Sequence, residues 1–227
     1  MAENKCQNAI SCAQDGYKKY KDNCYLNEIA KIYITIGNRK EAIKYYKRIY
    51  KNDNNNLYNI KSLAYNLFYI GDFKSALKFY KLVLDFEPQN SDNYFNVANM
   101  YHFMNKKKEA FDYYSFAINI NPKNISAINN LGLLYYENKY YDEAIPYFKR
   151  AIKLNSNHPE AYHHMGIIYR EYFKDLKMSK YYIKKALILD PNYPMNNYQL
   201  GLTFKKMGNN EEAKKLFKRS LELKPNY

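Results

Sequence analysis

The chain has 227 residues and a formal net charge of +14, and it contains only seven glycines and seven prolines. So few glycines and prolines argue against a turn-rich all-β fold and against a glycine-rich phosphate-binding loop. The positive charge attracts acidic partners at long range in a salt-dependent way, but it does not specify nucleic acid.

The N-terminal segment carries no recognisable targeting signal. Residues 1–15 lack a basic segment followed by an apolar one, and no stretch of the chain approaches the roughly 18 apolar residues of a membrane span. Cys6, Cys12 and Cys24 are odd in number and have no CxxC spacing, which favours free thiols in a reducing compartment. We therefore expect a soluble protein of the cytoplasm, or alternatively of the nucleus, with no membrane partner.

In chain order, residues 1–22 show no repeat, and we expect them to form a loose extension or an N-capping helix. From residue 23 onward small residues recur at a step of 34 residues, with one extra residue in the fifth unit. One series marks the first helix of each predicted pair, and another marks the second. The first series is Ala30, Ala64, Ala98, Gly132, Gly166 and Gly201. The second series is Ala42, Ala76, Ala110, Ala144, Ser179 and Ala213.

Aromatic residues follow most of these small residues at a constant distance, with Leu67 and Ile183 as substitutes. Small residues suit the places where two helices cross closely, and aromatic side chains fill the space to the next pair. The pattern predicts antiparallel helix pairs that bury their apolar faces by stacking on one another. The predicted pairs occupy residues 23–56, 57–90, 91–124, 125–158, 159–193 and 194–227.

The motifs of the repeat are clearest in the fourth unit. Residues 130–135 read NLGLLY, residues 142–145 read DEAI, and residues 148–152 read FKRAI. These motifs and their spacing resemble the tetratricopeptide-repeat family, and the resemblance covers residues 23–227. It implies an all-α fold, a right-handed superhelical solenoid of antiparallel helix pairs.

Three features depart from a regular array. The fifth unit carries its extra residue between positions 171 and 178, which predicts a longer or distorted turn between its helices. Pro146 lies inside a predicted helix and costs a hydrogen bond unless that helix begins late. The chain also stops at Tyr227 without the polar capping helix that such arrays usually need. We interpret this end as an excised fragment or as a face covered by a partner, and self-association through the uncapped repeat is one such arrangement.

The sequence shows no catalytic or metal-binding constellation. His163 and His164 are adjacent, so on a helix they point about 100° apart and cannot share a metal as an i, i+4 pair does. The GxSxG, HExxH, GxxxxGK[ST] and GxGxxG motifs are absent from the sequence. Acidic pairs such as Asp142 and Glu143 begin second helices, where they favour the helix dipole. We therefore expect no enzyme activity, no cofactor and no bound metal.

The resemblance implies that the first helices line a concave groove that binds a protein or an extended peptide. From the third unit onward, the side chains two residues before the first-series positions are amides or histidine. This column resembles that of the protein O-glycosyltransferases, where asparagines hold the backbone of an extended peptide, because an amide both donates and accepts. The alternative is that asparagine is merely abundant in this composition. The expected peptide-binding residues are Lys61, Tyr65, Asn96, Asn99, His102, Asn130, His164 and Gln199.

A carboxylate clamp for the acidic tails of chaperones is incomplete in this chain. The resemblance implies a Lys and an Asn on one first helix, an Asn on the next, and a Lys and an Arg on the third. Lys61 and Asn96 fit this pattern. Tyr65, however, replaces the first asparagine, and Ser126 and Asn130 replace the two cations. We therefore do not expect binding of chaperone tails.

These observations predict a non-enzymatic scaffold whose partner is a protein or a peptide. One alternative is the substrate-recognition arm of a larger enzyme such as a protein O-glycosyltransferase, for which a catalytic domain after Tyr227 in the full-length gene would decide. A second alternative is a nucleic-acid-associated scaffold. Basic runs such as residues 106–108 lack interleaved arginines and stacking aromatic residues, so we do not expect nucleic acid as a partner.

Overall fold

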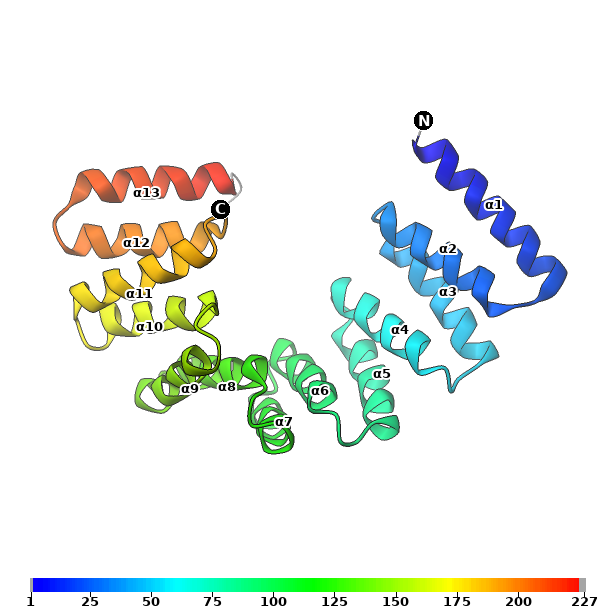
Figure 1. The fold of residues 1–227 in the computed structure, drawn as a ribbon, viewed down its shortest axis with the longest axis horizontal. Helices are drawn as coiled ribbons and strands as arrows, with labels where there is room; N and C mark the ends of the chain where they lie inside the picture. The colour runs from blue at the N-terminus through cyan, green and yellow to red at the C-terminus, as the bar shows by residue number, and fades with distance from the viewer. Residues whose placement is uncertain (1, 225–227) are drawn as a thin grey trace. The chain divides into compact units, whose positions relative to one another are not determined.

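A computed structural model describes the backbone of residues 2–224 and the side chains of residues 5–224 (Figure 1). This part of the chain forms thirteen α-helices and no strand, which confirms the predicted all-α fold. The chain divides into two compact units, Met1–Ile120 and Asn121–Tyr227. We describe each unit separately.

The first unit contains one long helix followed by three helix pairs. The long helix, α1 (Ala2–Tyr20), contacts the first pair through hydrogen bonds. The side-chain amide of Gln14 donates to the Tyr45 hydroxyl over 3.1 Å. Asn52 in turn donates to the Tyr17 hydroxyl over 3.1 Å. The pairs are α2 (Asn23–Thr35) with α3 (Arg39–Asn52), α4 (Leu57–Tyr69) with α5 (Phe73–Phe86), and α6 (Ser91–Phe103) with α7 (Lys107–Ile120).

The second unit contains three further pairs. They are α8 (Ile125–Glu137) with α9 (Tyr141–Leu154), α10 (Pro159–Glu171) with α11 (Leu176–Leu189), and α12 (Pro194–Lys206) with α13 (Asn210–Leu223). Among the described residues, none of these or the earlier helices is both long and apolar enough to cross a membrane.

The turn inside each pair follows from local backbone chemistry. At the end of α4, Gly71 has a φ of +80°, the left-handed conformation that glycine adopts without steric cost. The Asp72 amide then donates to the carbonyl of Leu67 over 3.0 Å, and the Asp72 carboxylate caps α5 by accepting from the Ser75 amide over 3.1 Å. One short segment therefore ends one helix and begins the next.

Small residues allow the two helices of a pair to approach closely. A Cβ added to Gly166 would lie 2.3 Å from Cγ1 of Ile183, and one added to Gly201 would lie 2.6 Å from the ring of Phe217. Distances this short leave no room for a methyl group unless the facing side chain or the helices themselves move. The small series seen in the sequence therefore marks the helix crossings.

The two internal departures from regularity also appear in the structure. The turn between α10 and α11 has four residues, 172–175, where the other pairs have three. The extra length brings the Tyr172 hydroxyl to Asp142 of α9, to whose Oδ2 it donates over 2.7 Å. α9 begins at Tyr141, so Pro146 lies inside the helix and cannot donate a hydrogen bond to the carbonyl of Asp142.

Candidate functional site

The first unit contains a groove with a volume of about 540 Å³. Most of its lining comes from α2, α4 and α6, the first helices of the three pairs, and we call it the α2/α4/α6 groove. Because first helices contribute side chains from three successive pairs, the groove runs across the repeats. Its lining residues are Lys31, Ile34, Tyr46, Tyr58, Lys61, Ser62, Tyr65, Asn66, Tyr80, Val83, Asn93 and Asn96.

Lys61 lies in this groove, but its ammonium group is already paired. Its Nζ donates to the two carboxylate oxygens of Glu87 over 2.8 and 3.0 Å. Asn93 donates to the carbonyl of Glu87 over 3.2 Å and to its carboxylate over 3.1 Å. Lys61, assisted by Asn93 and then Asn90, holds the pKa of Glu87 below its ordinary value. A ligand that binds Lys61 therefore has to compete with Glu87.

Tyr65 presents an aromatic surface to the groove and is 48% exposed. Its ring lies 4.7 Å from that of Tyr69, between ring centroids, and its hydrogen bond with Tyr69 raises the pKa of Tyr65. Arg39 stacks on the other ring, with its guanidinium carbon 4.3 Å from the Tyr69 centroid, and it also donates to Asn66 over 2.8 Å. Tyr69, itself held by Arg39, therefore fixes the position of the Tyr65 ring at the groove.

The three α6 residues expected in the site have different roles. Asn96 lines the groove, is half-buried and forms no side-chain hydrogen bond with another residue in the described part of the chain. Asn99, by contrast, accepts a 2.7 Å hydrogen bond from the hydroxyl of Tyr114, which is fully buried. His102 Nδ1 lies 3.3 Å from the same hydroxyl. Asn99 and His102 therefore fix the Tyr114 ring, and neither lines the groove.

Two of the expected residues in the second unit are also engaged. Asn130 on α8 accepts a long hydrogen bond of 3.4 Å from the side-chain amide of Asn129. The carbonyl oxygen of the Gln199 side chain, on α12, accepts from the guanidinium of Arg170 over 2.5 Å. Arg170 is only 3% exposed and also donates to Glu171 over 2.6 Å. The buried guanidinium of Arg170 therefore joins α10 to α12, and the repeat pattern gave no sign of this contact.

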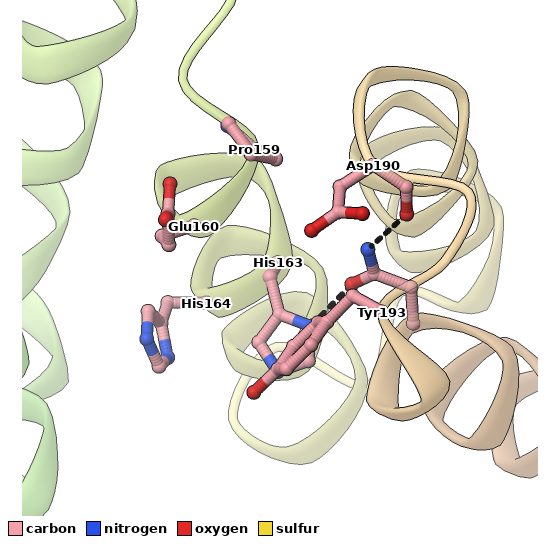
Figure 2. Close-up of a pocket in the computed structure, with 7 residues that line it drawn as sticks. Pro159, Glu160, His163, His164, Asp190 and Tyr193 are labelled. Atoms are coloured by element: carbon pink, nitrogen blue, oxygen red, sulfur yellow. Dashed lines mark hydrogen bonds between the residues drawn. The ribbon is translucent and has the colours of Figure 1, made fainter. Parts of the chain in front are cut away.

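His164 lies at a second cavity, of about 210 Å³, which we call the α10/α12 cavity (Figure 2). Its ring stacks on Phe148 with 5.3 Å between centroids, and its Nδ1 is buried without a hydrogen-bond partner among the described residues. Burial, followed by the charges of His163 and His158, lowers the pKa of His164 to about 3. The side chain is therefore neutral at physiological pH. The cavity is lined by Pro159, Glu160, His163, His164, Asp190, Tyr193 and Asn196.

The polar contacts of the α10/α12 cavity centre on Asn196. Its side-chain oxygen lies 2.8 Å from Nδ1 of His163, and its amide nitrogen donates to the backbone carbonyl of Asp190 over 3.2 Å (Figure 2). Burial lowers the pKa of His163, although the bond to Asn196 partly opposes this effect. Sequence reasoning did not find Asp190 or Asn196, because the contact between Asn196 and His163 joins residues 33 positions apart and forms only when α10 and α12 lie against each other.

The structure offers no metal centre within residues 5–224, since no three His, Cys, Asp or Glu side chains there lie close enough to hold an ion. His163 and His164 have ring centroids 5.2 Å apart and planes at 89°, so the two imidazoles do not converge.

Two sequence models of the tetratricopeptide repeat match this chain. One matches residues 125–158, and the other matches residues 25–56, 91–124 and 196–227. The helix pairs α4 with α5 and α10 with α11 fall outside these matches, although each is likewise a pair of helices joined by a short turn. Among curated proteins, no sequence matches the chain significantly.

Solved structures of tetratricopeptide-repeat proteins share this architecture. TTC0263 of Thermus thermophilus has a TM-score of 0.63 at 19% identity, covering 75% of this chain and 92% of its own. YrrB, described as having an unusual peptide-binding site, has a TM-score of 0.55 at 22% identity, covering 80% and 93%. The Cut9–Hcn1 hetero-tetramer of the APC/C gives 0.77 at 15% identity, covering 99% of this chain and 44% of that one. At such identities the likeness concerns the fold alone.

Proposed function

Because the chain belongs to the tetratricopeptide-repeat family, we propose that it is a non-enzymatic scaffold that binds an extended segment of a partner protein in the α2/α4/α6 groove. Repeats of this family generally serve protein interaction and not catalysis. The choice of this groove, and of the residues in it that bind the partner, rests on the contacts of the first unit. The proposal keeps six repeats from residue 23 onward, with α1 as a cap on the first pair.

The observation that carries this proposal is the open amide of Asn96. A primary amide can donate to a peptide carbonyl and accept from a peptide N–H at the same time, whatever side chains the peptide carries. Asn96 lines the groove with this capacity unused by the described part of the chain. It therefore offers a contact to the backbone of a bound segment.

Tyrosine rings beside Asn96 supply the apolar part of the contact. Tyr58 is 57% exposed and Tyr65 is 48% exposed, and both line the groove. Tyrosine provides a large contact area at a low cost in conformational entropy, since it has only two side-chain torsions.

The charge of the chain favours an acidic partner segment. The net charge of +14 increases the rate at which a negatively charged partner associates. Within the groove, Lys31 and Lys61 are paired with Glu28 and Glu87 at 2.8 Å. Acidic side chains of a ligand would exchange places with these carboxylates.

We also propose a cytoplasmic or nuclear location, and self-association through α12 and α13 as a secondary property.

The alternative of a recognition arm of a larger enzyme would be decided by a catalytic domain after Tyr227 in the full-length gene. The mode of binding that it suggests, a column of amides along the array, needs amides that are open. Asn96 is open, but Gln199 is bonded to Arg170 and Asn99 to Tyr114. These bonds favour a peptide contact concentrated at Asn96 over a ladder along the whole array. The general scaffold therefore stands as the first proposal.

The test begins with peptides selected from a displayed random library against the full chain. Asn96→Ala should weaken the selected peptide by about tenfold, because the loss of two net hydrogen bonds is worth about 1.4 kcal/mol. Isothermal calorimetry measures the affinity, and circular dichroism checks that the helices are intact. Asn55→Ala, in the exposed turn before α4, is the matched control and should leave the affinity unchanged. Equal affinities of the Asn96→Ala variant and the original chain would refute the role of the groove.

A further inference from the structure

The α10/α12 cavity contains a carboxylate with no cation beside it. Asp190 accepts a hydrogen bond through its backbone carbonyl, but its side chain forms no ion pair or hydrogen bond with any other described residue. Figure 2 shows this carboxylate pointing from the end of α11 toward α10. Asp190 is half-buried, so part of the water that would otherwise solvate its charge is excluded.

The same positions of the second repeat show what such a carboxylate binds. In that repeat, Glu87 ends α5 and Asn93 of the next helix donates to its backbone carbonyl over 3.2 Å. Asn196 donates to the carbonyl of Asp190 over the same distance. The two groups therefore have the same arrangement around the start of the next repeat. In the second repeat the ammonium group of Lys61 completes it, 2.8 Å from Glu87.

His163 occupies the position of Lys61 in the fifth repeat and cannot replace its charge. Its Nδ1 is taken by Asn196 at 2.8 Å, and burial keeps its pKa below the ordinary value, so the ring is neutral at physiological pH. An imidazole is also much shorter than a lysine side chain. In the fifth repeat a shorter and neutral side chain therefore lines the cavity at the position where the second repeat has a lysine.

The other walls of the cavity suit a cation with an apolar stem. Tyr193 and His163 present rings whose centroids are 5.8 Å apart, and an aromatic face attracts a cation within about 6 Å. Glu160 adds a second carboxylate, and it is also 3.2 Å from His158. The volume of about 210 Å³ accommodates one side chain and not a folded segment.

We propose that the α10/α12 cavity binds the side chain of a lysine from the partner protein, whose ammonium group pairs with Asp190 as Lys61 pairs with Glu87 within the chain. This inference relies on the proposed function only in taking a protein as the natural source of the lysine. The cavity lies in the second unit and the α2/α4/α6 groove in the first, so the two sites are tested separately.

The experiment uses the full chain and two small probes, Nα-acetyl-lysine methylamide and its uncharged counterpart Nα-acetyl-norleucine methylamide. A titration followed by two-dimensional amide NMR should show saturable shifts at the non-proline residues of 190–196 with the lysine probe and none with norleucine. Asp190→Asn should weaken the lysine probe by at least about tenfold, because it removes the charge of a partly desolvated pair. Asp53→Asn, at the matching position of the first repeat, is the control and should leave the binding unchanged.

A second variant tests the comparison between repeats directly. His163→Lys should place an internal ammonium group beside Asp190 and thereby block the lysine probe, while the chain stays folded. Similar shifts with lysine and norleucine, or unchanged binding to the Asp190→Asn variant, would overturn the proposal. Equal or tighter binding of Nα-acetyl-arginine methylamide would overturn the choice of lysine. None of these results would affect the groove proposal, which depends on Asn96.

Discussion

Asparagine has three distinct roles in this chain, and they are separated by contacts and not by residue type. Asn38 and Asn90 cap helices by accepting from backbone amides over 3.2 and 3.0 Å. Asn99 holds the buried hydroxyl of Tyr114. Asn96, one helical turn before Asn99, has no such bond within the described chain. The abundance of asparagine is therefore partly structural, and it becomes a binding feature only where the amide remains open.

Histidine shows the same dependence on surroundings, and it leads to a prediction about acid stability. His164 has a pKa of about 3 in the folded chain against an ordinary value of 6.5, since burial disfavours the charged ring. Between these values the unfolded chain binds more protons than the folded one, so stability falls as the pH drops below about 6.5. At about pH 5 this loss amounts to about 2 kcal/mol relative to neutral pH.

We expect His164→Phe to remove most of that loss, because phenylalanine keeps the ring packing on Phe148 and does not titrate. Urea unfolding at about pH 7.5 and about pH 5, followed by circular dichroism, measures the difference. The comparison at about pH 7.5 is the internal control for any change in packing. His163, whose pKa burial also lowers, retains its own smaller contribution. An unaltered pH dependence in the variant would show that His164 is accessible to protons in the folded chain.

At the scale of single elements, the turns show how different residues reach one conformation. Gly37, Gly71 and Gly208 end their helices at φ values near +80°, whereas Asn105 and Lys139 occupy the matching place at +56° and +64°. Residues other than glycine adopt this left-handed backbone conformation at a steric cost, which is smaller for asparagine than for most others. The turn geometry is therefore imposed by the stacking of the pair, and glycine meets it with the least strain.

Within the helices, Pro146 of α9 has a direct consequence for the stability of the fold. Inside α9 it forfeits one backbone hydrogen bond, and its ring crowds the preceding turn. We expect Pro146→Ala to raise the free energy of unfolding by about 2 kcal/mol, since the gain of about 3 kcal/mol in the helix is partly offset by a more flexible unfolded chain. Urea unfolding of the full chain measures this change.

Pro159 provides the matched control for that prediction. It occupies the first turn of α10, where the missing N–H would have no partner in the helix. Pro159→Ala should therefore give no gain, and a slight loss is expected because proline restricts the unfolded chain. Equal stabilisation by the two substitutions would mean that the position within the helix is unimportant, contrary to the argument for Pro146.

At the scale of the whole molecule, the excess of cationic side chains governs weak association. A charge of +14 attracts any polyanion, including nucleic acid, but binding made only of phosphate contacts weakens steeply with salt. Fluorescence anisotropy with a random-sequence single-stranded RNA should show binding at about 50 mM NaCl and its loss by about 200 mM. Tight binding that persists at the higher concentration would favour the nucleic-acid scaffold over the protein-binding one.

The repeat architecture was predictable from the amino-acid sequence because its causes are local and periodic. A crossing such as that of Gly166 with Ile183 demands a small residue in every pair, and the resulting period of small and aromatic residues is visible without coordinates. The extra residue before α11 and the proline in α9 could also be recognised in the sequence, because each interrupts this regular repeat.

Whether a given polar side chain is paired within the chain or left open was not predictable from the sequence, because its partners come from adjacent repeats. Glu87 reaches Lys61 across 26 positions, and Gln199 reaches Arg170 across 29. Such pairs meet only when one helix pair stacks on the next, and a change from lysine to histidine at one position leaves Asp190 open. Folding therefore separates the amides and carboxylates that the chain uses internally from those it leaves available to a partner, although their residue types are the same.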